Sequence, residues 1–187
     1  MKYLIAGLGN IGDEYANTRH NIGFIVLDAL LKDSVIKFRP GRYASTAKIK
    51  FRGKTLVLIK PATYMNLSGK AIRYWLEKEN IPTNKLLVVV DDIALPTATL
   101  RIRKKGGDGG HNGLISIIEN INTPDFARLR IGIGGDFARG YQSDYVLGKW
   151  TQAEEKIMIP QVELASEAIK SFVAIGVDKT MNKFNKI

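Results

Sequence analysis

His20 is the residue whose type and surroundings most readily suggest acid–base chemistry. It lies in a polar loop beside Arg19 and Asn21, directly before an apolar segment with helical spacing. Histidine changes its charge between about pH 5 and 8, so it can exchange protons with water near neutral pH. A lone histidine in a loop is more often an ordinary surface residue. Its chemistry therefore depends on the side chains that the fold places beside it.

Three other polar residues follow predicted strands near the point where each strand ends: Asn10, Asn66 and Asp91. Ligands gather at the carboxyl ends of strands in open α/β sheets, so we expect these residues to lie near His20. A carboxylate beside an imidazole fixes its tautomer and stabilises its charged form. The sequence has no Cys and no Ser in a G-x-S-x-G turn, so it favours a base that activates water over a covalent acyl-enzyme.

Asp91 and Asp92 also allow a plainer interpretation. Acidic residues are frequent where strands give way to turns, and two adjacent carboxylates could bind Mg²⁺. Neighbouring residues of a strand point to opposite faces of the sheet. We therefore expect at most one of the two to face any given site.

The segment from Gly7 to Gly12 matches the pattern G-x-G-x-x-G after a predicted strand, which raises the alternative of dinucleotide binding. That motif needs a helix that starts within the glycines, so that the helix N-terminus meets the pyrophosphate. Here residues 13–21 are polar and lack a helical period, and the first helical pattern starts near Ile22. No acidic residue follows a second strand, because Asp28 lies within the helical pattern. These differences argue against a dinucleotide site.

Basic residues gather around a glycine-rich segment, residues 104–112. Arg101 and Arg103 alternate along the predicted strand before it, and Arg128 and Arg130 alternate along a later strand. The net charge is +10, from 28 Lys and Arg against 18 Asp and Glu. A basic surface can serve solubility alone, but basic residues on strands beside a glycine loop favour a surface that binds nucleic acid.

Strand and helix patterns alternate along the chain. We predict strands over residues 2–8, 44–51, 54–59, 85–90, 99–103 and 129–133, and helices over 22–31, 68–78, 114–121 and from Thr151 onwards. The last helix starts with a capping box, Thr151 and Glu154, and Pro160 should kink or split it. This order predicts one α/β domain over residues 1–187: a three-layer sandwich with a mixed, mostly parallel, twisted sheet between helices.

Composition narrows the class of protein. Hydrophobic residues make up 45% of the chain and charged residues 25%, which is typical of a folded domain, so we expect disorder only in the Lys- and Asn-rich tail, residues 179–187. No apolar run approaches the ~18 residues that cross a bilayer. The absence of Cys excludes disulfides and thiolate zinc sites. Together these features indicate a cytoplasmic protein.

Five segments resemble, in order, motifs of the bacterial peptidyl-tRNA hydrolase family. They are GLGNIGDEYANTRHNIGF (7–24), KPATYMNLSG (60–69), VVVDDIALP (88–96), GGDGGHNGL (106–114) and RLRIGIG (128–134). The similarity extends over nearly the whole chain. Three positions depart from the family pattern: Ile11 stands where Pro is frequent, Ala94 replaces an acid, and Asp108 adds a negative charge to the glycine loop.

The resemblance implies a role for each matching residue. His20 would be the general base, and Asp91 would orient it. The substrate would be bound by Asn10 near the ester, Tyr15 in the same pocket, Met65 and Asn66 on the peptide side, and Asn112 at the water or the developing oxyanion. The phosphates of the tRNA would be bound by Arg103, Lys105 and Arg130.

The activity implied by this resemblance is hydrolysis of the ester bond between peptide and tRNA, which recycles tRNA after premature termination and so belongs to ribosome rescue. It needs no cofactor or metal, and it would be performed by a monomer that does not bind membranes. A noncatalytic RNA-binding module is a rival, but it leaves His20 and Asp91 without a role. The dinucleotide enzyme is a second rival. A peptidyl-tRNA cleavage assay and a test of NAD binding would separate the three.

Overall fold

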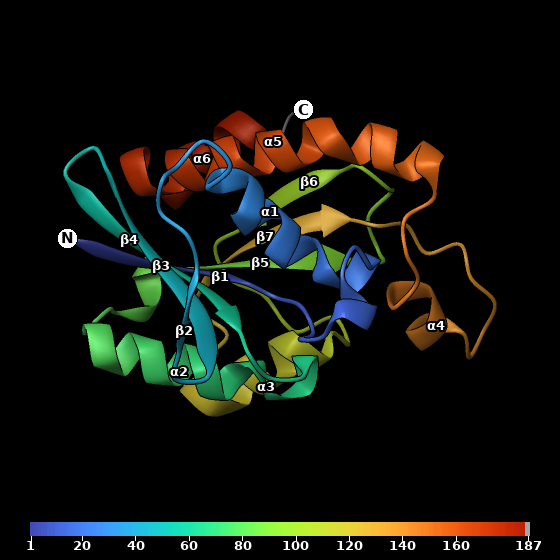
Figure 1. The fold of residues 1–187 in the computed structure, drawn as a ribbon, viewed down its shortest axis with the longest axis horizontal. Helices are drawn as coiled ribbons and strands as arrows, with labels where there is room; N and C mark the ends of the chain where they lie inside the picture. Colours follow the sequence, from blue (N-terminus) through green and yellow to red (C-terminus); the bar gives the residue numbers. More distant parts are fainter. Residues whose placement is uncertain (186–187) are drawn as a thin grey trace.

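In a computed structural model that describes residues 1–185, seven strands form a single sheet in the order β2-β3-β4-β1-β5-β7-β6 (Figure 1). The strands are β1 (Lys2–Gly7), β2 (Arg39–Gly41), β3 (Ala44–Phe51), β4 (Lys54–Pro61), β5 (Leu86–Asp92), β6 (Leu100–Arg103) and β7 (Ala127–Gly132). The helices are α1 (Ile22–Leu30), α2 (Ser68–Glu79), α3 (Asn112–Ile121), α4 (Gln142–Val146), α5 (Gln152–Ile175) and α6 (Val177–Phe184). Within this part of the chain, no helix is both long and apolar enough to span a membrane.

The centre of the sheet is parallel and its margins are antiparallel. β4, β1, β5 and β7 run in one direction. β3 pairs antiparallel with both β2 and β4, and β6 pairs antiparallel with β7. Helices α1, α5 and α6 cover one face, and α2 and α3 cover the other (Figure 1). This confirms the predicted fold class, a three-layer α/β sandwich with a mixed sheet.

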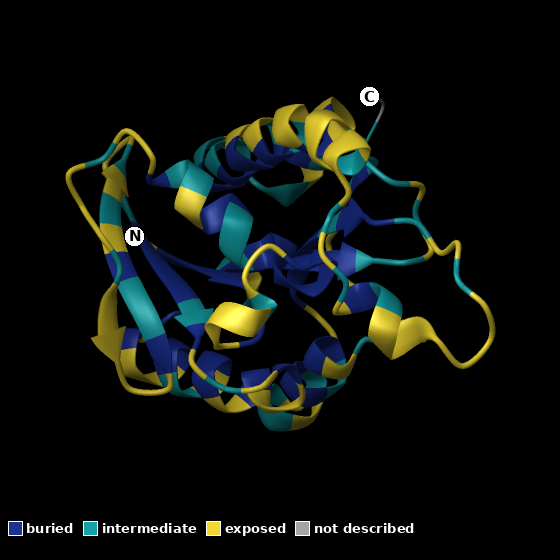
Figure 2. Cartoon of the chain, turned by 45° about the vertical axis from the view of Figure 1, so that its right-hand side comes forward, coloured by how far each residue is buried: buried dark blue, intermediate teal, exposed yellow. Residues whose placement is uncertain are grey.

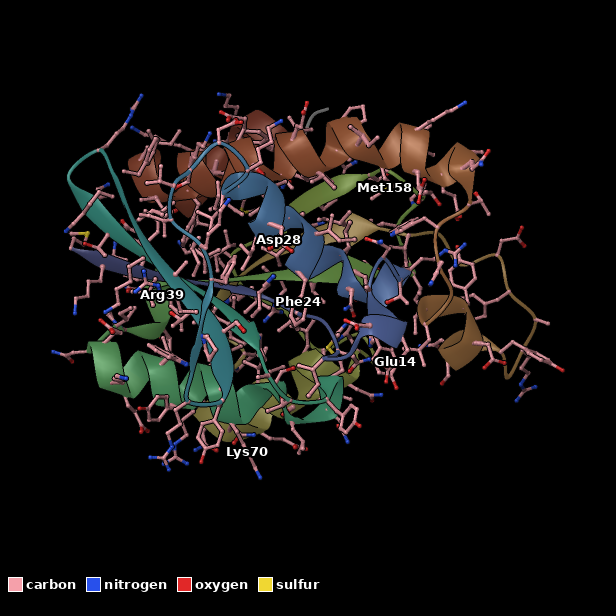
Figure 3. All side chains as sticks on the ribbon, in the orientation of Figure 1. Glu14, Phe24, Asp28, Arg39, Lys70 and Met158 are labelled. Carbon is pink, nitrogen blue, oxygen red and sulfur yellow. The ribbon has the colours of Figure 1, made fainter. Side chains whose placement is uncertain are left out.

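Successive side chains along the strands point to opposite faces of the sheet, so a separate hydrophobic core forms on each face. On β1 and β5, Ile5 and Val89 belong to the core beneath α1 and α5, whereas Leu4 and Val88 belong to the core beneath α2 and α3. Both faces are apolar because both are covered, which explains the continuous apolar runs of the central strands. Figure 2 shows the central strands largely buried and the outer surfaces of the helices exposed. In Figure 3, the labelled Lys70 projects outward from α2.

The glycines of the first motif let α1 approach the end of β1. A Cβ on Gly7 would lie 2.3 Å from the Gly23 carbonyl oxygen, and one on Gly23 would lie 2.3 Å from the Leu8 nitrogen. The ring of Phe24, labelled in Figure 3, lies against Gly9. These close contacts explain why glycine is needed here without any bound phosphate, and α1 starts at Ile22, beyond the glycines. The segment between them carries His20 back to the edge of the sheet.

Some expectations about the elements were wrong or incomplete. The capping box at Thr151 is present, but α5 continues through Pro160 and is not split. The tail that we expected to be disordered forms α6 up to Phe184, while residues 186–187 lie outside the described part. Phe184 is buried against the α5 core, so an apolar contact far away in the sequence orders this polar segment. The short elements β2 and α4 were not predicted.

Candidate active site

His20 and Asp91 meet at the carboxyl edge of the sheet, as the sequence predicted. His20 lies in a short 3₁₀ turn, Arg19–Asn21, that leads into α1, and Asp91 is near the end of β5. The Nδ1 atom of His20 lies 2.9 Å and 3.0 Å from the two carboxylate oxygens of Asp91, and both residues are buried. Because the carboxylate accepts, Nδ1 carries the proton in the neutral ring. Nε2 then keeps its lone pair, and no residue of the described part is hydrogen-bonded to it.

His111 is a second imidazole on the same carboxylate, and sequence reasoning did not place it there. Its Nε2 lies 2.9 Å from Asp91 Oδ1, and its ring lies 4.9 Å from that of His20. The other ring nitrogen, Nδ1, accepts hydrogen bonds from the backbone N–H groups of Gly113 and Leu114 and so caps α3. Nε2 must therefore be the protonated nitrogen of a neutral His111. The sequence feature that could have revealed this contact was the position of His111 in the GGHNG motif, beside Asn112.

Asp91 is held as a carboxylate. Its burial by itself raises its pKa, but attraction to His111 and His20, together with the hydrogen bonds from both rings, outweighs burial and holds the pKa well below its ordinary value. The site therefore contains a negative charge at neutral pH. Such a charge favours the protonated form of a neighbouring imidazole.

Asn10 is oriented by a buried hydrogen-bond network that includes Asn21. The Asn10 backbone N–H donates to Asn21 Oδ1 at 2.8 Å, and Asn21 Nδ2 donates to the Asn10 carbonyl at 2.9 Å. The side-chain oxygen of Asn10 accepts from the Met65 backbone N–H at 2.7 Å. Its Nδ2 group forms no hydrogen bond within the described part, so it is available as a donor. Asn21, the neighbour of His20, is thus a positioning residue that sequence reasoning missed.

A cavity of about 130 Å³ opens beside His20 and Asp91. The predicted site residues that line it are His20, Asp91, Asn112 and Arg130, together with Asp92, Asp108, His111 and the α4 residues Gln142, Ser143 and Val146. Met65 is buried behind the cavity, in contact with the position of Gly113. No serine hydroxyl of the described part is hydrogen-bonded to the His20 ring. The cavity therefore presents an imidazole base rather than a serine nucleophile.

Six predicted residues lie outside the lining of this cavity: the buried Asn10 and Met65, and four that are at least partly exposed. Asn66, Arg103 and Lys105 are exposed, and Tyr15 is partly exposed. Arg103 is on β6, where it pairs in register with Arg128 of β7, and Arg101 pairs with Arg130. The side chains of these four arginines lie on one face of the two strands, and those of Leu100 and Ile102 lie on the other face. The predicted basic residues thus share one face at this margin of the sheet, but only Arg103 of the four is fully exposed.

Arg128 differs from the other arginines because it is almost completely buried. It lies over the Phe126 ring and donates to the carbonyls of Gly107 and Pro124. Its guanidinium therefore holds the glycine loop in place and is not presented to solvent.

Asp92 corrects one expectation from the sequence. The side chains of Asp91 and Asp92 point to opposite faces of the sheet, as neighbouring strand residues do. Both nevertheless line the cavity, because it lies beyond the end of the strand. Asp92 does not contact either histidine. It forms an ion pair with Arg130, another predicted site residue.

Arg19 connects the catalytic loop to the wall of the cavity. Its guanidinium forms an ion pair with Glu154 at 2.8 Å, donates to the Tyr145 carbonyl, and lies over the rings of Tyr145 and Trp150. Since Tyr145 belongs to α4, one buried cation joins the His20 loop, α4 and the start of α5. Neither the burial of Arg19 nor its partners could be predicted from the sequence.

His20, Asp91 and His111 are also the group in the described part whose ligand atoms, all within 4.8 Å of one another, could hold a metal ion. The hydrogen bonds of His111 argue against this use. A metal on its Nε2 would displace the proton and require it on Nδ1, which already faces two backbone N–H donors. The donor set therefore fits a proton-transfer site better than a metal site.

The fold is a mixed α/β sheet with a buried His–Asp pair beside a cavity at its carboxyl edge, an arrangement that can take a proton from water. Comparison with known proteins gives the family: residues 4–187 match the model described as Peptidyl-tRNA hydrolase, and the chain belongs to this family. The enzyme class predicted from the sequence, a hydrolase that acts on the ester bond of peptidyl-tRNA, is thereby confirmed.

Individual relatives are similar over their whole length. A peptidyl-tRNA hydrolase of Phocaeicola vulgatus is 58% identical over 186 residues, and one of Bacteroides fragilis is 55% identical, with 100% of each chain covered in both cases. The crystal structure of peptidyl-tRNA hydrolase from Acinetobacter baumannii is 34% identical, with a TM-score of 0.92, and the match covers 98% of this chain and 94% of that one.

Proposed function

We propose that this protein hydrolyses peptidyl-tRNA with His20 as the general base and Asp91 as the residue that orients it. The observation that carries the proposal is the pairing of His20 Nδ1 with Asp91, which leaves Nε2 free beside the cavity. The substrate ester joins the peptide's carboxyl carbon to a ribose hydroxyl. Nε2 takes a proton from water while the water oxygen attacks that carbon, and the imidazolium that forms is stabilised by Asp91. The imidazolium then returns the proton to the ribose oxygen as the ester C–O bond breaks, which releases the peptide acid and the tRNA.

In the proposal, two uncharged side-chain amides supply the hydrogen-bond donors for the developing oxyanion. Asn10 presents Nδ2, because its oxygen is used by Met65, and Asn112 lines the cavity at the start of α3. In the proposal, these amides donate to the carbonyl oxygen as it gains charge. Met65 and Asn66 then lie on the peptide side, and Tyr15 contacts the same end of the substrate.

The basic margin of the sheet receives the tRNA. Arg103 and Lys105 are exposed on β6 and the glycine loop, and Arg130 lines the cavity. Phosphates bound at these cations place the acylated end of the tRNA at His20. We further propose that residues 1–187 act as one domain, as a cytoplasmic monomer that needs no cofactor, and that the cellular role is the recycling of tRNA from stalled translation.

The test is cleavage of a defined peptidyl-tRNA, followed as release of free tRNA. The wild-type protein should cleave it, and His20→Ala should bind it without cleaving it. Binding of tRNA without cleavage by the wild type would instead support the noncatalytic RNA-binding alternative.

A further inference from the structure

Arg130 already has an anionic partner within the protein. Its Nε donates to Asp92 Oδ2 at 2.5 Å, and the other carboxylate oxygen of Asp92 accepts from the Ala94 backbone N–H at 2.8 Å. The second bond fixes the direction of the carboxylate. The side chains are 25% and 16% exposed, so the pair lies where solvent and substrate can reach it.

The lining of the cavity is acidic although the chain is basic. Arg130 faces it together with three carboxylates, those of Asp91, Asp92 and Asp108, whereas the whole chain carries a net charge of +10. A phosphate that approaches Arg130 must share the guanidinium with Asp92 or displace it. Like charges so close together repel each other, and the repulsion is only partly screened in a recessed site.

We propose that Asp92 is an internal counter-anion of Arg130, which makes this position selective for phosphates of a tRNA that is also bound elsewhere. The inference rests on the proposed function of Arg130 in tRNA binding and identifies the residue that controls it. A free phosphate must overcome Asp92 with no other contact. A phosphate of a tRNA bound at Arg103 and Lys105 is held at a high effective concentration, so it can compete with Asp92.

The experiment measures the affinity of free inorganic phosphate by an NMR titration of the Arg130 Nε–H signal, independently of cleavage. In Asp92→Asn, phosphate should bind at least about fivefold more tightly than in the wild type. Asp108→Asn is the matched control, because it removes the same charge from the same cavity but has no bond to Arg130. Its affinity for phosphate should stay within about twofold of the wild type.

Asp92→Ser is a second variant, which keeps an oxygen for the Ala94 N–H group and should also bind phosphate more tightly. Unchanged or weaker binding of phosphate in both Asp92 variants would overturn the proposal, since Asp92 would then serve only to orient Arg130. Equal tightening in Asp108→Asn would also overturn it, because the effect would belong to the net charge of the cavity. A wild-type protein that fails to cleave peptidyl-tRNA would count against the proposed function alone.

Discussion

His111 Nε2 lies 2.9 Å from Asp91 Oδ1, so the carboxylate that orients His20 is shared between two imidazoles. The two rings are not equivalent. His20 has a free Nε2 beside the cavity, whereas both nitrogens of His111 are occupied, by Asp91 and by the N-terminus of α3. This asymmetry supports the proposal that His20 is the base and that His111 holds Asp91 in place.

His20→Ala should therefore remove turnover while tRNA binding persists. We expect kcat to fall by roughly 10²–10⁴-fold, the usual contribution of a general base, and the Kd for tRNA to change by less than about threefold because the basic residues are untouched. Single-turnover cleavage and a filter-binding assay measure the two quantities. His111→Ala is the matched control and should lose less activity. A larger loss in His111→Ala than in His20→Ala would show that the base was misassigned.

Asp91→Asn should keep the shape of the site but remove its fixed charge. Without that charge the imidazolium that forms in the reaction is no longer stabilised, so kcat should fall by on the order of 10²-fold. Single-turnover cleavage by both proteins checks this. Asp92→Asn should lose less activity, since Asp92 contacts neither histidine. An equal loss in both variants would contradict the assignment.

Arg103→Ala and Arg130→Ala should each weaken tRNA binding and reduce its dependence on salt. Loss of one phosphate contact lowers the slope of log K against log[salt] by about 0.7–0.9. The slope is measured by titration at several salt concentrations. Lys50→Ala is the control, because Lys50 is exposed at the far end of β3 and should leave the slope unchanged. Loss of turnover with an unchanged slope would argue against the phosphate role.

Cleavage should continue after removal of divalent metal ions. The physical reason is the protonated Nε2 of His111, which removes one ligand from the site's possible metal set. Rates with and without a chelator, on a substrate whose tRNA fold is verified by circular dichroism, provide the measurement. Loss of activity that a divalent ion restores, with the tRNA still folded, would contradict this prediction.

Glu154→Gln should destabilise the protein in a pH-dependent way. Burial raises the pKa of Glu154, but bonds from Thr151 and Arg19 outweigh it, so the folded-state pKa is below its ordinary value. A lowered pKa stabilises the fold above the unfolded-state value of ~4.3, and this contribution is lost as the pH falls. Denaturant unfolding should show a deficit of roughly 1.5–3 kcal/mol at pH 7, the usual contribution of hydrogen bonds to a charged group, and the deficit should shrink below pH ~4. Asp144→Asn is the control, since Asp144 is exposed on α4. A deficit independent of pH would rule out the ion pair as its cause.

The sequence by itself determined most of the elements and the family. Apolar runs and alternation placed most of the strands, because a side chain's face follows from its position along a strand. Five motifs in one order, among them those around His20, Asp91 and Asn112, identified the family and its reaction, because together they are far more specific than any one of them. The sequence also showed that β5 ends in two acidic residues, but it did not show which residue pairs with each of them.

Only the tertiary structure decided how these residues are connected. His111 reaches Asp91, Asn21 holds Asn10, and Asp92 pairs with Arg130 because the ends of β1, β5 and β7 meet the loops before α1 and α3 at one edge. Arg19 and Arg128 became buried anchors, and the polar tail became α6, through contacts with residues far away in the chain. Local periodicity reports which face a side chain takes, whereas the partner it meets there depends on how distant segments pack.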